Sequence, residues 1–304
     1  MVRHFLTIED LNASELHAVL DRAAALKTAR RAGKNDPTLR GKSLAMIFEK
    51  PSTRTRVSFE VAMYELGGHA LHLTSQASQL GRGETYADTA RVLSRFVHGI
   101  TIRTFEQVRA EELAAAATVP VINALSDLSH PCQILADLLT IQETRGHLND
   151  LKVAYVGDGN NVANSWIEAA IVLQFQLAIA TPPGFEPAAS LRSRVQQQGL
   201  RHVQIGHDAI AAVRDAHAIN TDTWVSMGQE GAGEIAKKQA FTPFQVNAAL
   251  LRHAAPDAIA LHCLPAHRGE EITDDVMDGP QSRILDQAEN RLHAQKALLE
   301  MLLR

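Results

Sequence analysis

The stretch STRTR at residues 52–56 gathers hydroxyl and guanidinium groups directly after an apolar run, SLAMIF at 43–48. The residues from 57 onward have the pattern of an amphipathic helix, whose first backbone N–H groups lack partners within the helix. N–H groups, hydroxyls and arginines that meet at one point form a cradle for a small anion such as phosphate. The alternative is an ordinary Ser/Thr helix cap with solvated arginines.

Two further polar clusters lie in the first half of the chain. Arg103 comes at the end of an expected strand, and the run SHPCQ at 129–133 begins an expected helix. An arginine and a histidine in these places could polarise a carbonyl group, whereas a lone arginine at a strand end more often forms a surface ion pair. Ligands of parallel sheets bind beyond the carboxyl ends of the strands, where these clusters fall.

In the second half, GDGNN at 157–161 only weakly matches a dinucleotide-binding turn, because the final glycine of G-x-G-x-x-G is absent. We interpret Asn160 and Asn161 as hydrogen-bonding groups for an amino acid. Asp222 is a strand-end carboxylate suited to an ammonium group, although a helix cap explains it too. His262 and Cys263 are adjacent and have no second pair at zinc-finger spacing, so we expect no structural zinc.

The elements that must position these groups alternate between strand and helix. A helix is expected over 11–31, and another begins at His130 and ends before Gly146. The alternation predicts an α/β fold with two Rossmann-like domains, each with a parallel sheet, joined by long helices. The first domain is expected over 1–140, completed by a C-terminal helix at about 282–304, and the second over 141–281. Strands are expected within the runs 43–48, 69–73, 99–104, 120–125, 151–161, 176–183, 216–222 and 257–265.

Composition excludes several classes of function. The 304 residues are 45% hydrophobic and carry a net charge of −4. The chain therefore lacks the excess of basic residues that is typical of nucleic-acid-binding proteins. The chain has two cysteines, Cys132 and Cys263, which favours a reducing compartment, and we expect a cytoplasmic protein. No stretch has the pattern of a signal peptide or a membrane span, so we expect no membrane partner.

Taken together, STRTR, HPCQ, DTWVSMG and HCLP, in this order, resemble the carbamoyltransferases and in particular their ornithine branch. The aspartate enzymes have a HPLPR-like stretch where this chain has HCLPA. The resemblance covers nearly the whole chain and implies transfer of a carbamoyl group from carbamoyl phosphate to L-ornithine, giving L-citrulline. Arg103, His130 and Cys263 would be the catalytic residues.

The resemblance also implies the ligands of each substrate. Ornithine would be bound by Asn161, Asp222, Ser226 and Met227. Carbamoyl phosphate would be bound by Ser52, Thr53, Arg54, Thr55, Gln79, Arg103, His130, Pro131, Cys132, Gln133, Cys263, Leu264 and Arg291.

Neither a metal nor an organic cofactor is implied. The expected assembly is a homotrimer in which Gln79 acts across the subunit interface, and the expected role is arginine biosynthesis. The alternatives are a carbamoyltransferase for aspartate or an acylated ornithine, an enzyme of arginine breakdown, and an inactive relative that binds small anions. An inactive relative would be expected to lack Arg54, Arg103, His130 or Cys263, and all four are present.

Overall fold

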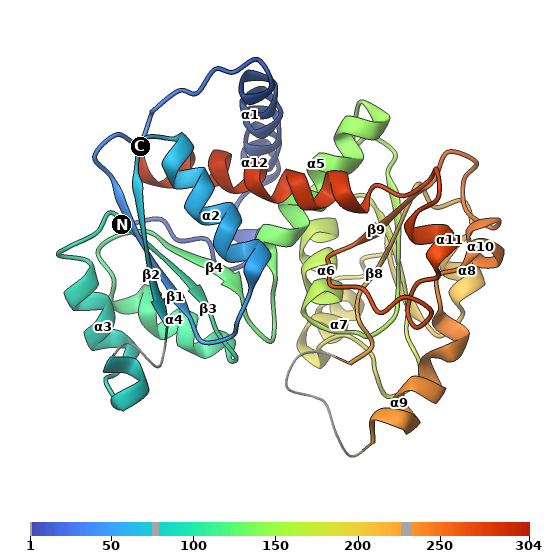
Figure 1. Ribbon diagram of the computed structural model, residues 1–304. Coiled ribbons are helices and arrows are strands. Elements are labelled where there is room, and N and C mark those ends of the chain that lie inside the picture. The colour runs from blue at the N-terminus through green and yellow to red at the C-terminus, as the bar shows by residue number, and fades with distance from the viewer. Residues whose placement is uncertain (1, 75–78, 226–232) are drawn as a thin grey trace. The chain divides into compact units, whose positions relative to one another are not determined.

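The computed structural model describes residues 2–74, 79–225 and 233–304 (Figure 1). The chain forms two compact units, which we call unit 1 (Met1–Leu139 and Glu289–Arg304) and unit 2 (Thr140–Ala288). Each contains a parallel sheet with helices on both faces, so the predicted α/β fold class is confirmed. Among the described residues, no helix has both the length and the apolar composition needed to cross a membrane.

The sheet of unit 1 has the strand order β2-β1-β3-β4, and each neighbouring pair is parallel. Its strands are β1 Ser43–Phe48, β2 His69–Thr74, β3 Gly99–Arg103 and β4 Val121–Leu125. The helices are α1 Ala13–Arg31, α2 Thr53–Glu65, α3 Tyr86–Leu93 and α4 Gln107–Ala116, with short 3-10 turns η1 Ile8–Asp10 and η3 Gln79–Arg82.

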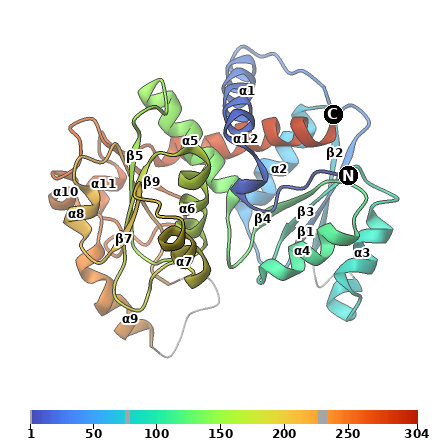
Figure 2. The same cartoon turned by 180° about the vertical axis from the view of Figure 1, so that it is seen from behind.

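Both faces of this sheet are covered, which is why β1 and β3 are apolar throughout most of their length. Helices α3 and α4 pack on one face through a core that includes Ala90, Leu113 and Ile102, and α2 lies on the other (Figures 1 and 2). Of the two long helices that cross the boundary between the units, α5 spans Pro131–Arg145 and α12 spans Ile284–Leu303.

The part of α12 that belongs to unit 1 is held against α1 and α2 by buried polar contacts. Lys27 of α1 donates to Asn290 Oδ1 at 2.7 Å, and both side chains are buried. Lys296 pairs with Glu65 of α2 at 2.7 Å. These contacts fix the position of α12 along its axis, and Arg291 lies one residue beyond Asn290.

Helix α1 shows how a local signal sets an element's start. Asn12 caps the helix by accepting the Glu15 N–H at 3.0 Å, and the Glu15 carboxylate accepts the Asn12 N–H in return. The predicted helix over 11–31 therefore begins at Ala13.

The sheet of unit 2 has the order β7-β6-β5-β8-β9, again parallel. Its strands are β5 Lys152–Val156, β6 Gln176–Ala180, β7 Val203–Gly206, β8 Ala218–Thr221 and β9 Ile259–His262. Helices α6 and α7 cover one face, and α8, α10 and α11 the other (Figure 2). The helices are α6 Asn161–Leu173, α7 Ala189–Gln197, α8 Ala209–Val213, α9 Glu234–Phe241, α10 Ala248–Leu251 and α11 Asp274–Met277, with the 3-10 turn η4 Thr242–Phe244.

Strand β7 is not among the strands that the sequence predicts. It is four residues long, lies at the sheet edge and exposes Gln204, so it lacks the continuous apolar run that marks the buried strands. It is a strand because its backbone pairs with that of β6, and this pairing is not encoded in the four residues themselves.

Candidate active site

In both units the polar groups gather where the strand order reverses. In unit 1, β1 and β3 are neighbours, and the chain extends from them in opposite directions to β2 and β4. The STRTR run comes after β1, and Arg103 ends β3. In unit 2 the neighbours are β5 and β8, and they are followed by Asn160 and Asp222. Such reversal points are where open α/β sheets bind their ligands.

The STRTR run forms the start of helix α2. Ser52 is the N-cap, and its hydroxyl accepts the Thr55 N–H at 3.3 Å. Thr55 is buried and Arg54 half-buried, whereas Arg56 is exposed and pairs with Glu60 at 2.9 Å. The helix cap is therefore present, and only the first arginine of the run is drawn inward.

A cavity of 720 Å³ lies beside this helix start. Its lining includes Lys50, Ser52, Thr53 and His72. Lys50 packs over the Phe105 ring at 4.3 Å. Burial, and then the Arg103 charge, lower the pKa of Lys50.

A buried hydrogen-bonded cluster joins α12 to the start of α2 and α5. The Arg291 guanidinium, 3% exposed, donates to Thr55 Oγ1 at 2.6 Å and to Gln133 Oε1, and lies 3.4 Å from His130 Nε2. Gln133 in turn donates to Asp137 Oδ1 at 2.7 Å. Groups up to 236 positions apart in the sequence thus meet around one cation.

His130 is a neutral imidazole in this setting. Burial lowers its pKa well below the usual value, and the charges of Arg291, Arg103 and Arg54 lower the pKa further. A neutral imidazole donates through one ring nitrogen only, while the three guanidinium groups make the surroundings attractive to an anion. The arrangement suits an anionic ligand with a neighbouring polarised carbonyl.

The other residues predicted in this region have different surroundings. Pro131 is the first residue of α5, a position that suits proline. The buried Cys132 thiol donates to the Asn123 carbonyl at 3.4 Å, and burial raises its pKa to about 12, so its side chain is a packing group. Gln79 opens η3 and is exposed. The prediction on Ser226 and Met227 concerns residues that lie outside the described ones.

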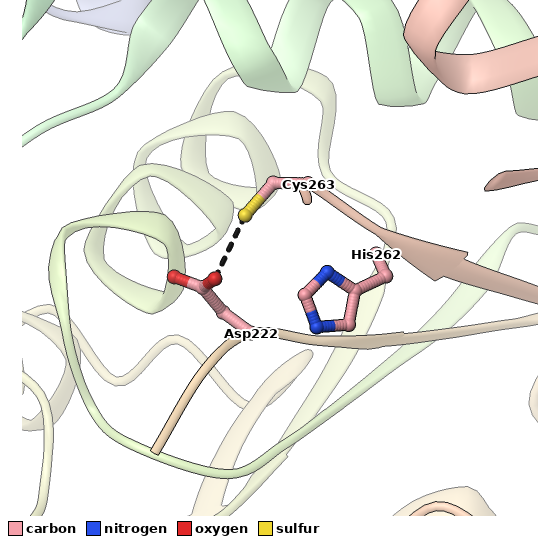
Figure 3. A group of neighbouring side chains, drawn as sticks. All are labelled: Asp222, His262 and Cys263. Atoms are coloured by element: carbon pink, nitrogen blue, oxygen red, sulfur yellow. Dashed lines mark hydrogen bonds between the residues drawn. The ribbon is translucent and has the colours of Figure 1, made fainter. Parts of the chain in front are cut away.

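In unit 2, Asp222 is the centre of a second hydrogen-bonded group. Asn160 caps α6 by accepting the Val162 N–H at 2.9 Å, and its amide donates to Asp222 Oδ2 at 2.7 Å. The Cys263 thiol points at the other oxygen, Asp222 Oδ1, at 2.8 Å (Figure 3). Asn161, predicted as one of the ornithine ligands, is the first residue of α6 and directly follows Asn160.

His262 supports the turn that carries Cys263 and Leu264. The Leu264 N–H donates to His262 Nδ1 at 2.8 Å, so the ring proton is on Nε2, which donates to Glu271 Oε1 at 2.9 Å. Leu264 has a positive φ of 59°. Its N–H bond to the ring helps to hold this uncommon backbone conformation.

Asp222, His262 and Cys263 lie close enough together to hold a metal ion (Figure 3). Both ring nitrogens of His262 are already engaged in hydrogen bonds. A metal ion bound here would require His262 to lose one of these two hydrogen bonds. In the present arrangement the imidazole stabilises the turn through both.

The fold has cationic groups at the reversal point of one sheet and a carboxylate group at that of the other, and known proteins share it. Residues 3–143 match the family described as aspartate/ornithine carbamoyltransferase, carbamoyl-P binding domain, and residues 149–302 match its Asp/Orn binding domain. The chain belongs to the aspartate/ornithine carbamoyltransferase family.

Individual relatives match over the full length. An ornithine carbamoyltransferase of Syntrophus aciditrophicus is 54% identical, with 100% of both chains covered. The anabolic ornithine carbamoyltransferase of Pyrococcus furiosus is 53% identical, covering 99% of this chain and 96% of the relative. A solved structure of ornithine carbamoyltransferase from Pyrococcus furiosus has a TM-score of 0.94 at 53% identity, covering 99% of this chain and 97% of the other.

The sequence prediction did not include Asp137, which orients Gln133, or Glu271, which orients His262. A partial signal was present for Asp137, because it lies four residues after Gln133 and so on the same face of a helix. No comparable signal marks Glu271, because the turn that brings it back to His262 is irregular.

Proposed function

We propose that this protein transfers the carbamoyl group of carbamoyl phosphate to L-ornithine, forming L-citrulline and inorganic phosphate. The observation that carries the proposal is the buried cluster of Arg291, Thr55, Gln133 and His130 at the start of α2 and α5. Full-length similarity to proteins named ornithine carbamoyltransferase supports the choice of substrate.

In unit 1, the start of α2 holds the phosphate. Backbone N–H groups at a helix N-terminus and the Arg54 guanidinium are suited to a dianion. Arg103, His130 and Thr55 surround the carbonyl oxygen, where negative charge develops as the tetrahedral intermediate forms. Gln133 accepts from the carbamoyl NH₂ group, since its oxygen is directed at the cluster and its amide nitrogen is held by Asp137.

In unit 2, the Asp222 carboxylate holds the α-ammonium of ornithine, and Cys263 lies in the surroundings of the reacting amine. The Asn160 amide and the Cys263 thiol donate to separate oxygens of Asp222, which fixes the plane of the carboxylate. The δ-nitrogen forms a bond to the carbonyl carbon, the carbon–oxygen bond to phosphate breaks, and the amine loses a proton. The departing phosphate is a suitable acceptor for that proton.

The test is a citrulline assay with purified protein and carbamoyl phosphate, in which ornithine, aspartate and N-acetylornithine are supplied separately. Ornithine should be carbamoylated fastest. Faster reaction of aspartate or N-acetylornithine would overturn the choice of substrate, and no product from any of them would overturn the proposal as a whole.

The cellular setting is also part of the proposal. We infer a cytoplasmic homotrimer that works in arginine biosynthesis, with Gln79 completing a neighbour's phosphate site. The relative from Pyrococcus furiosus is named anabolic, which supports a role in biosynthesis and not in breakdown. Cys132 and Cys263 are both thiols and do not form a disulfide, which is compatible with a reducing compartment. The exposed position of Gln79 at the start of η3 leaves it accessible to a neighbouring subunit.

A further inference from the structure

Glu49 is a buried carboxylate that the proposed reaction does not use. It comes directly after β1 and three residues before the Ser52 cap of α2. Its side chain is only 7% exposed. A carboxylate removed from water in this way is retained only where hydrogen bonds replace its hydration.

Three donors from three separate parts of the chain supply those hydrogen bonds. They are the hydroxyl of Tyr86, the first residue of α3; the hydroxyl of Thr104, directly after β3; and Nη1 of Arg109 in α4, at 3.1 Å. The backbone N–H of Glu49 also donates to the Arg103 carbonyl at 2.9 Å. One residue therefore links the ends of β1 and β3 to the starts of α3 and α4.

These links concern groups to which the proposed function gives direct roles. Arg103 is bonded through its carbonyl to Glu49 and is followed by Thr104, which is bonded to the Glu49 carboxylate. Gln79, the first residue of η3, lies seven residues before Tyr86, the first residue of α3. The Glu84 N–H between them donates to the Gln79 carbonyl at 3.1 Å. Tyr86 remains a donor at neutral pH, because burial and the Glu49 carboxylate raise its pKa to about 12.

We propose that Glu49 is a positioning residue for carbamoyl phosphate, which holds Arg103 and the start of α2 at the separation that the ligand requires. This inference rests on the proposed function. Glu49 itself need not touch the ligand, since its carboxylate is occupied by Tyr86, Thr104 and Arg109. Loss of its charge would loosen the phosphate site and leave the ornithine site of unit 2 unaltered.

The chain offers a matched control. Arg109 also pairs with Glu106, at 3.0 Å, through its other terminal nitrogen, but the Glu106 side chain is 57% exposed. Glu49→Gln and Glu106→Gln each remove one carboxylate charge from the same arginine. Exposed pairs of this kind contribute little, so only the change at Glu49 should affect ligand binding.

The experiment measures inorganic phosphate binding by titration calorimetry, together with the KM values for carbamoyl phosphate and ornithine. In Glu49→Gln, we expect phosphate affinity to fall, and KM for carbamoyl phosphate to rise, by about tenfold to a hundredfold, because charge-assisted hydrogen bonds to the carboxylate are lost. KM for ornithine should change by less than about twofold, since that substrate binds other groups. Glu106→Gln should match the wild type in all three measurements.

A purely structural role would reduce the amount of folded protein and leave the affinity of the folded fraction unchanged. Wild-type phosphate affinity in folded Glu49→Gln, or an equal rise in both KM values, would overturn the inference. If Glu49→Gln fails to fold, Tyr86→Phe and Thr104→Val each remove one donor with little change of shape, and both should weaken phosphate binding selectively; wild-type affinity in both would overturn it. Because phosphate binding needs no ornithine, failure of the citrulline assay would leave this comparison intact.

Discussion

Replacing Arg291 by methionine keeps most of the side chain's length and removes its charge and hydrogen bonds. Arg291 is 3% exposed and donates to Thr55 Oγ1 at 2.6 Å and to Gln133 Oε1. A hydrogen bond to a charged group is worth about 1.5–3 kcal/mol, and here both acceptors would be left buried. Since the two bonds share one guanidinium, the free energy of unfolding should fall by about 2–5 kcal/mol.

Urea unfolding followed by far-UV circular dichroism measures this loss, and Arg31→Met is the control. Arg31 also pairs with α12, at 3.2 Å from Glu289 Oε2, but its side chain is 65% exposed. An exposed pair contributes about 0–1 kcal/mol, so the control should unfold almost as the wild type does. Equal shifts in the two variants would refute the view that buried contacts of Arg291 hold α12 to the start of α2.

The same substitution has a predictable effect on His130. After burial, the Arg291 charge is the largest cause of its low pKa, so Arg291→Met should raise that pKa toward the ordinary value. Proton NMR titration of the ring, assigned by comparison with His130→Gln, measures the change. A pKa that stays where it was, or falls, would contradict this account of the charges around His130.

The low pKa of His130 also affects stability. Below the ordinary histidine pKa of about 6.5, His130 is protonated in the unfolded chain but stays neutral in the folded protein. As the pH is lowered through this range, the free energy of unfolding therefore decreases by up to about 1.4 kcal/mol per pH unit because of this group. Above a pH of about 6.5, His130 is neutral in both states and no longer makes stability depend on pH. Arg291→Met narrows the gap between the folded and unfolded pKa values, so the part of the acid sensitivity due to His130 should become smaller.

Three further predictions test the two binding regions. Arg54→Ala and Arg103→Ala should each lower kcat/KM by about 10²–10³-fold, because each removes a charged donor from the phosphate or the oxyanion; near-wild-type citrulline formation would remove that residue from the site. Cys263→Ser replaces the donor to Asp222 and should lower activity and alter its pH profile with unchanged circular dichroism, whereas an unchanged profile would leave Cys263 a packing residue. Gln79→Ala and Asp222→Ala, each nearly inactive alone, should regain about one site in four when reassembled together as random trimers. Mixed trimers without activity would show that Gln79 does not act across the interface.

Local signals in the sequence were sufficient for most of the fold. The apolar run at 43–48 coincides with β1, and the Asn12 and Glu15 pair marks the start of α1, because burial pattern and helix capping depend on residues a few positions apart. Alternation of strands and helices likewise predicted parallel sheets. Strand β7 was missed because its pairing depends on β6 and not on its own four residues.

The sequence alone also identified the residue types at the ends of the strands, but not their contacts. Strand order and helix packing decide that Arg291 meets Thr55 and that Asn160 donates to Asp222. They also bring Tyr86, Thr104 and Arg109 to the Glu49 carboxylate. Such contacts join positions from 37 to 236 residues apart. Helical and strand periodicity carry no information over these separations, so only the packed tertiary structure decides which side chains share a site.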